Sequence, residues 1–242
     1  MSNFGKWIAG GLGWAFFGPI GGILGFVLGS VLDNEKVQQP NSSSKIGQTT
    51  TGGYVMSLLV LIAAVMKADG KVLKSELNYV REFLIRTFGP DSAQEAIKML
   101  RDLLNQNIPV ADVCLQIQKN MDYSSRLEML HFLFGIAQAD GKVDAQEQQT
   151  LAYIATKMGI NNRDFESIKS MFVSDTNAAY KILEIDPSAT DADVKKAYRK
   201  MAMKYHPDKV SYLGEDIQNT AKEKFQKVNK AYETIKKERN IA

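Results

Sequence analysis

The chain has 242 residues, enough for one to three domains, and its 45% hydrophobic and 24% charged content is ordinary for a globular protein. The net charge of +3 is uneven. From Thr176 onward there are 14 Lys or Arg against 10 Asp or Glu, a balance of +4, while the remainder holds 16 against 17, a balance of −1. Cys114 is the only cysteine, which excludes an intrachain disulfide and a cysteine zinc site. Two histidines, His131 and His206, leave little for a histidine-based metal centre.

Residues 1–33 predict a membrane anchor. No charged side chain occurs from Trp7 to Leu32, and these 26 residues exceed the ~20 that a helix needs to cross a hydrocarbon core. A cleaved signal peptide is the alternative, but the only charge before the apolar run is Lys6, and no clear small-x-small cleavage site precedes Asp33. We therefore expect residues 7–32 to lie in lipid.

Glycine spacing and one proline bear on the shape of this anchor. Gly18 and Gly22 lie four residues apart, a spacing typical of helices that approach closely in lipid, so a homodimer through this segment is one expectation. Pro19 leaves open whether the segment is one kinked helix or a helix broken at that point. Residues 34–53 are rich in Ser, Thr, Asn and Gln, and we expect a flexible linker that spans about 25 Å.

Residues 54–175 predict a duplicated helical unit. The segment Ala68-Asp69-Gly70-Lys71-Val72 recurs as Ala139-Asp140-Gly141-Lys142-Val143, and Glu76 and Glu147 follow at the same offset. Each copy reads as an apolar helix, an Asp-Gly break and a more polar helix. Further helices are expected at 91–105, 110–121 and 162–172, with breaks at Pro90 and Pro109. His131, within an apolar run, is expected to be a packed helix residue.

The two Asp-Gly segments allow two interpretations. Gly70 and Gly141 can end helices in the left-handed conformation, and Asp144 with Glu147 has the spacing of a capping box. A shared acidic site for a metal or a partner is the other interpretation. An ordinary calcium loop is excluded, because its first and third positions hold Val65 and Lys67 in one copy and Ile136 and Gln138 in the other. This region resembles the TerB-like, tellurite-resistance-associated helical domain, and the resemblance implies that acidic residues of the repeat, some of them metal-binding in family members, match Asp69, Glu76, Asp140 and Glu147.

The C-terminal region predicts a helical hairpin. A short helix at 179–183 is followed by a second helix that starts with a capping-box-like pair, Thr190 and Asp193. Pro207 disfavours helical backbone at the preceding residue, so this helix should stop near Tyr205. We expect a loop at 210–214 and then a third helix whose apolar face packs on the second. His206 and Asp208 should lie on an exposed turn that projects from one end of the pair.

The second helix carries one basic face. Its cations are Lys195, Lys196, Arg199, Lys200 and Lys204, and Asp208 is the only acid from Lys195 to Lys209. Such a face attracts an acidic partner surface and speeds encounter. Nucleic acid is not predicted, because the positive surplus is small and the aromatic residues fall on the buried face. An acid–base pair of His206 and Asp208 lacks an identifiable nucleophile, so we do not predict an enzyme.

Several motifs in register resemble the J domain of DnaJ-type co-chaperones. They are Tyr180-x-Ile-Leu, Ala197-Tyr-Arg-Lys, Lys204-Tyr-His-Pro-Asp-Lys and Val228-Asn-Lys-Ala-Tyr-Glu. The resemblance implies docking on an Hsp70 (DnaK) and stimulation of its ATP hydrolysis through His206, Pro207 and Asp208, together with the basic face. Asp208 is suited to a charge-assisted hydrogen bond with a partner arginine, and Pro207 lowers the ordering cost of docking. The tyrosines at 180, 198 and 232, with Phe225, are expected in the core.

The order of the three parts resembles the DjlA family of membrane-anchored DnaJ-like proteins. The expected fold is all-α, with a transmembrane anchor at 1–33, a linker at 34–53, a TerB-like bundle at 54–175 and a J domain at 176–242. The resemblance implies a bacterial inner-membrane protein with its C-terminal domains in the cytoplasm, where Hsp70 and ATP are found. Expected partners are Hsp70, unidentified clients recruited by the TerB-like domain, and lipid around residues 7–32, without a cofactor. The alternative is a stress or metal-response adaptor in which the J domain is secondary.

Overall fold

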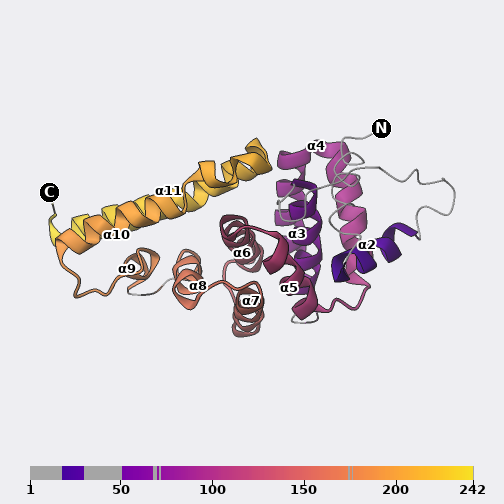
Figure 1. Ribbon diagram of the computed structural model, residues 1–242, viewed down its shortest axis with the longest axis horizontal. Coiled ribbons are helices and arrows are strands. Elements are labelled where there is room, and N and C mark those ends of the chain that lie inside the picture. The colour runs from indigo at the N-terminus through magenta and orange to yellow at the C-terminus, as the bar shows by residue number, and fades with distance from the viewer. Residues whose placement is uncertain are drawn as a thin grey trace.

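The computed structural model describes residues 18–29, 51–67, 70, 72–173, 175 and 177–241, and every regular element among them is helical, as predicted. In chain order they are α2 (Pro19–Gly29), α3 (Thr51–Met66), α4 (Lys74–Leu104), α5 (Val110–Asn120), α6 (Tyr123–Ala137), α7 (Ala145–Lys157), α8 (Asn162–Lys169), α9 (Ala178–Ile182), α10 (Asp191–Lys204), the 3-10 helix η1 (Pro207–Leu213) and α11 (Glu215–Arg239). Helices α3 to α8 form a bundle, and α9 to α11 form the hairpin domain beside it (Figure 1).

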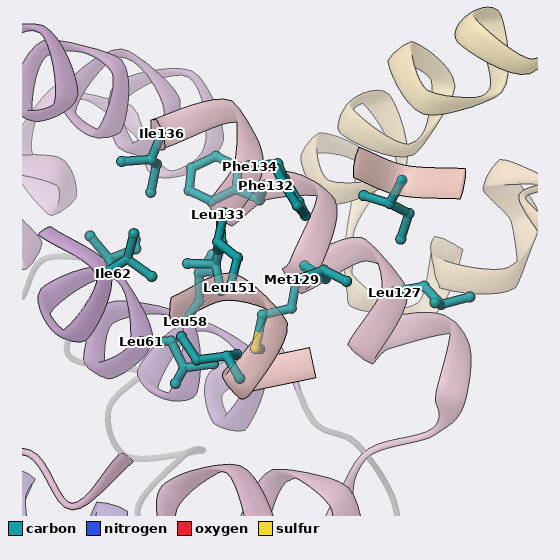
Figure 2. Close-up of a cluster of buried hydrophobic side chains, with 14 of the residues drawn as sticks. Leu58, Leu61, Ile62, Leu127, Met129, Phe132, Leu133, Phe134, Ile136 and Leu151 are labelled. Atoms are coloured by element: carbon teal, nitrogen blue, oxygen red, sulfur yellow. The ribbon is translucent and has the colours of Figure 1, made fainter. Parts of the chain in front are cut away.

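Helix α3 is the centre of the bundle. Its 16 residues carry no charge, and every residue from Gly52 to Met66 is buried, so neighbouring helices cover it on all sides. Figure 2 shows Leu58 and Ile62 of α3 facing Leu133 of α6 and Leu151 of α7. An all-round apolar sequence of this kind is stable only when it is enclosed, because burial of apolar area is the main favourable term in folding. The helix begins at Thr51, three residues before the bundle boundary expected from composition.

The internal duplication is visible as two helix pairs, α3 with α4 and α6 with α7. Gly70 and Gly141 have positive φ values of 76° and 106°, which confirms the expected left-handed breaks. In the second copy, Asp144 and Glu147 form a reciprocal capping box with two hydrogen bonds of 2.8 Å. The first copy retains half of it, because Glu76 accepts the backbone N–H of Leu73 at 2.8 Å while leucine offers no acceptor in return.

The other expected helices of the bundle are present. Helix α4 contains a break at Gly89, whose φ is 77°, and Pro90 begins its second segment. The expected helices at 110–121 and 162–172 correspond to α5 and α8. His131 is a buried residue of α6 and contacts the ring of Phe172, which confirms it as a packed residue.

Helix α2 is the described part of the expected anchor. It begins at Pro19 and has 11 residues, about 16 Å of helix. Within the described ranges, the structure contains no helix that is both long enough and apolar enough to span a bilayer. Residues 1–17 and 30–50 lie outside the described residues, so the prediction of one spanning segment over 7–32 and the prediction of a linker over most of 34–53 stay predictions.

The hairpin pairs α10 with α11, and the end that carries η1 lies against the bundle, whereas the end with the C terminus points away from it (Figure 1). The expected loop at 210–214 is wrong in detail, because residues 207–213 form the 3-10 helix η1. Pro207 stands at its first position, where a fixed φ and a missing N–H are tolerated. Buried Val210 and Leu213 then anchor η1 to the core.

Candidate functional site

The His206-Pro207-Asp208 loop lies where α10 gives way to η1. Helix α10 ends at Lys204, as the proline predicted, and His206 has extended backbone with φ −64° and ψ 131°. Nδ1 of His206 accepts the backbone N–H of Asp208 at 3.3 Å, and the hydroxyl of Ser211 donates to the Asp208 carbonyl at 2.8 Å. Pro207 is buried between its two exposed neighbours. The loop is therefore built from local hydrogen bonds around a rigid, packed proline.

The polar groups of this loop face solvent. The side chain of His206 is 50% exposed and that of Asp208 is 73% exposed. One Asp208 carboxylate oxygen accepts a hydrogen bond from Nε2 of Gln218 on α11 at 3.1 Å, and the His206 ring packs edge-on against Phe225 at 5.8 Å between centroids. The two side chains are thus oriented from α11 before any partner arrives, which lowers the ordering cost of docking.

A basic ridge on α10, made of Lys195, Lys196 and Arg199, leads toward this loop. All three residues are exposed, and within the described part of the chain no ion pair involves them. Lys200 continues the ridge with a side chain that is 63% exposed, and it lies 3.4 Å from a carboxylate oxygen of Glu184. These charges are available to an acidic partner because all of them are exposed, although Lys196 lies near enough to Asp193 to help lower the pKa of that acid.

Lys204 has a different environment, although it belongs to the same basic pattern. Its side chain is 21% exposed and lies between two nearly buried carboxylates, Asp164 of α8 and Glu184, with Oε1 of Glu184 at 2.6 Å. Burial acts to raise the pKa of Asp164, but a hydrogen bond shared with Glu184 and those accepted from Lys204 and Tyr123 hold that pKa below its usual range. Burial and the neighbouring Asp164 raise the pKa of Glu184. Lys204 therefore joins the hairpin to the bundle.

The loop end of the hairpin is attached to the bundle by further polar contacts. The hydroxyl of Tyr212 on η1 donates to Asp122, the N-cap of α6, and lies 2.6 Å from the hydroxyl of Ser125. Lys224 of α11 forms a buried ion pair with Glu128 of α6, with exposed fractions of 4% and 1%. The sequence predicted a loop that projects from the hairpin, whereas this end lies on α6, and only its outer side is open.

Met203 is a surface residue that the sequence reasoning missed. It is 66% exposed, the largest exposed fraction among the exposed large hydrophobic residues of the described chain. On α10 it lies four residues after Arg199 and therefore on the same side of the helix as the basic ridge. Its position off the apolar stripe of α10 was the available signal, because a helix buries only the residues of one stripe.

Three of the four aromatic residues expected in the hairpin core, Tyr180, Tyr198 and Tyr232, are found there, whereas Phe225 lies at its edge. Tyr180 is buried, and Tyr198 stacks on Tyr232 with ring centroids 4.2 Å apart. Phe225 is half-buried beneath His206. These rings hold α9, α10 and α11 together, which leaves the polar loop and the ridge as the exposed features of the hairpin.

The acidic turns of the bundle lie close to one another. Burial raises the pKa of Glu147 to about 7, and the charges of Asp144, Glu76 and Asp140 act in the same direction. Glu76 and Glu147 use their carboxylates as helix caps. Among the described residues no group of three or more His, Cys, Asp or Glu is arranged to hold a metal ion. Asp69 lies outside the described residues, so the metal interpretation of all four acids stays untested.

Three family models match consecutive parts of the chain. The tellurite resistance protein TerB model matches residues 56–170, the DnaJ domain model matches residues 178–242, and the model of the co-chaperone DjlA transmembrane domain matches residues 1–45. The chain belongs to the DjlA-type co-chaperones. The J domain of this family is the hairpin domain described above, and the TerB domain is the bundle.

Curated relatives agree with this assignment along the whole chain. The chain is similar to the co-chaperone protein DjlA of Coxiella burnetii, with 26% identity over all of both chains. It is 23% identical to DjlA of Haemophilus influenzae over 97% of this chain and 98% of the relative, and 27% identical to DjlA of Vibrio vulnificus over 78% and 79%. No solved structure matches the chain. The chain is thus a J-domain co-chaperone that also carries a DjlA-type N-terminal segment.

Proposed function

We propose that this DjlA-type chain docks on a bacterial Hsp70 (DnaK) and stimulates its ATP hydrolysis at the inner membrane. The observation that carries the proposal is the loop itself: His206 and Asp208 are exposed and held by Gln218 and Phe225 at the end of an unpaired basic ridge. A charged, preoriented surface of this kind suits electrostatic encounter followed by a short-range polar contact.

Each part of the site has a separate role in this proposal. Lys195, Lys196 and Arg199 attract an acidic Hsp70 surface, and Asp208 accepts a charge-assisted hydrogen bond from a partner arginine. Lys200 contributes to the ridge from its partly paired position. Lys204 keeps α10 attached to the bundle, so its contribution to docking is indirect. The protein regulates the ATPase of its partner and performs no chemistry of its own.

The remaining parts determine where docking occurs. The N-terminal segment, which matches a transmembrane family model, anchors the protein through residues 7–32, and the C-terminal domains face the cytoplasm, where Hsp70 and ATP are found. The TerB-like bundle recruits clients or partner proteins. A homodimer through the glycine-spaced segment remains part of the proposal, and Gly22 lies exposed on α2 in support of it.

The direct test is the steady-state ATPase activity of the cognate Hsp70 in the presence of the full chain in lipid nanodiscs. We expect stimulation by the wild-type chain and its loss in His206→Gln, because glutamine replaces the ring that packs on Phe225. Lys237→Gln, at the exposed far end of α11, is the matched surface control and should stimulate as the wild type does. Equal stimulation by His206→Gln and wild type, or none by either, would refute the proposal.

A further inference from the structure

Helix α2 occupies a groove of the bundle. The helix lies against α3, α4 and α5 (Figure 1), and the side chains of Ile20 and Leu24 are 0% and 2% exposed. These two residues are four apart and therefore lie on one side of α2. Gly22 lies on the opposite, exposed side, where an added Cβ would meet nothing within 4 Å. The groove thus binds the apolar side of a short, uncharged helix and leaves the glycine side free.

One polar residue of the groove recognises the start of this helix. Gln116 of α5 is buried, and its Oε1 accepts the backbone N–H of Ile20 at 3.0 Å. That N–H lies in the first turn of α2 and has no acceptor within its own helix. Nε2 of Gln116 is buried without a hydrogen-bond partner. At Gly18, whose φ is +155°, a Cβ would lie 2.7 Å from Oε1 of Gln116, so a larger residue there would displace the amide that accepts the Ile20 N–H.

The same segment has a second, mutually exclusive location. Residues 1–45 match the DjlA transmembrane model, and residues 18–29 cannot be in a bilayer and in this groove at the same time. The linker that the sequence predicts over residues 34–53 lies mostly outside the described residues, and its expected span of about 25 Å would permit either location. When the anchor enters the membrane, the groove loses Ile20 and Leu24, and a buried amide side chain loses its partner.

We propose that in the anchored protein this groove binds a short apolar helical segment of a client protein. The occupant has the chemistry of α2: no charge, a small residue before the first turn, and aliphatic side chains four positions apart. Because Gln116 accepts an N–H that every helix leaves unsatisfied at its start, recognition depends on helix geometry and apolarity and not on one client sequence. The inference rests on the proposed client-recruiting role of the bundle, and it assigns that role to α3, α4 and α5.

The probe for this groove is a peptide of twelve residues that keeps the Gly-Pro start and the aliphatic positions of α2 and differs from it elsewhere. It begins Gly-Pro, carries leucine at positions three, six and seven and alanine elsewhere, and ends in three added lysines with a fluorophore. Binding to the full chain in nanodiscs is measured by fluorescence anisotropy, with empty nanodiscs as the blank. No Hsp70 is present, so failure of this assay is distinguishable from failure of the ATPase test.

We expect saturable binding that Gln116→Leu weakens about tenfold, because the first-turn N–H of the probe is then buried without an acceptor. The control is Leu115→Gln on the exposed side of α5, which should bind as the wild type does. A probe with glutamate at positions three and seven should not bind. This second control changes the peptide and leaves the protein as wild type.

Two outcomes overturn the inference. One is an absence of binding above the empty nanodiscs, or equal affinity for wild type and Gln116→Leu with both variants folded by circular dichroism. The other is a dimer in which a second copy occupies the groove. Residues 18–29 of that copy would then crosslink beside Gln116, and the probe would not bind. In either case the groove does not serve a client.

Discussion

The two ends of helix α10 both carry basic side chains, but these side chains have different roles. Near its start, Lys195, Lys196 and Arg199 extend into solvent, and no ion pair in the described structure involves them. At its end, Lys204 lies between two nearly buried carboxylates from the bundle and the hairpin. The basic residues of α10 therefore include a surface that is available to partners and a contact that attaches the hairpin to the bundle. Only the environment of each side chain separates the two uses.

The largest effect should come from breaking the buried ion pair between Lys224 of α11 and Glu128 of α6, which attaches the loop end of the hairpin to the bundle. Glu128→Leu leaves the ammonium of Lys224 buried without its carboxylate, and we expect a loss of about 3–5 kcal/mol in the free energy of unfolding. Urea denaturation of the full chain in detergent, followed by circular dichroism, measures it. The double variant Glu128→Leu/Lys224→Met should recover most of the loss. A single variant as stable as wild type would show that the pair does not hold the domains together.

A direct comparison of the two ends should give an intermediate effect. Lys204→Met removes the cation shared by Asp164 and Glu184, and we expect it to destabilise the protein by about 2 kcal/mol. Lys196→Met, on the ridge, should change the same unfolding free energy by less than about 0.5 kcal/mol. Equal effects in the two variants would contradict the division of α10 into a fixed end and a free end.

The smallest effect concerns an acid that its surroundings disfavour. The pKa of Glu147 is raised to about 7, so the folded protein retains a proton that the unfolded chain has already released between the ordinary pKa and pH 7. The free energy of unfolding therefore falls as the pH rises through this window and Glu147 becomes charged. Because the side chain is partly exposed, screening by solvent limits this loss to about 1 kcal/mol. Glu147→Gln should be more stable than wild type by that amount at pH 8 and equal to it near pH 4.

The acid prediction is checked by urea denaturation at the two pH values. Glu233→Gln, an exposed position on α11, is the control for loss of one negative charge. A stabilisation by Glu147→Gln that is the same at both pH values would mean that the proton is not involved, and that glutamine is simply a better cap for Asp144.

Sequence reasoning succeeded where the determinants are local. The capping pair Thr190 and Asp193, the helix end before Pro207 and the left-handed Gly141 each depend on residues within one turn, and the structure has all three. The placement of the hairpin on the bundle was not predictable. Tyr212 and Lys204 find their partners 90 and 40 positions away, at Asp122 and Asp164, and no pattern within the hairpin indicates those contacts.

The candidate site shows the same limit. Its residue types were predictable, because the His206-Pro207-Asp208 motif and the basic face are patterns along one helix and one turn. The distinction between Lys196 and Lys204 was not, since it depends on carboxylates supplied by α8 and by the turn after α9. The position of Met203 outside the apolar stripe of α10 indicates a surface residue, but how far its side chain is exposed depends on which neighbours pack on α10.

We propose that the basic ridge on α10 guides this co-chaperone onto Hsp70, and the kinetics of association measure that role. The association rate of the full chain in nanodiscs with ATP-bound Hsp70 is measured from low to high salt for wild type, for Lys195→Gln/Lys196→Gln/Arg199→Gln, and for the control Lys236→Gln/Lys237→Gln. We predict that the ridge variant associates about tenfold more slowly at low salt, with a shallower salt dependence and unchanged stability. A ridge variant that associates as fast as wild type at every salt concentration would contradict the account.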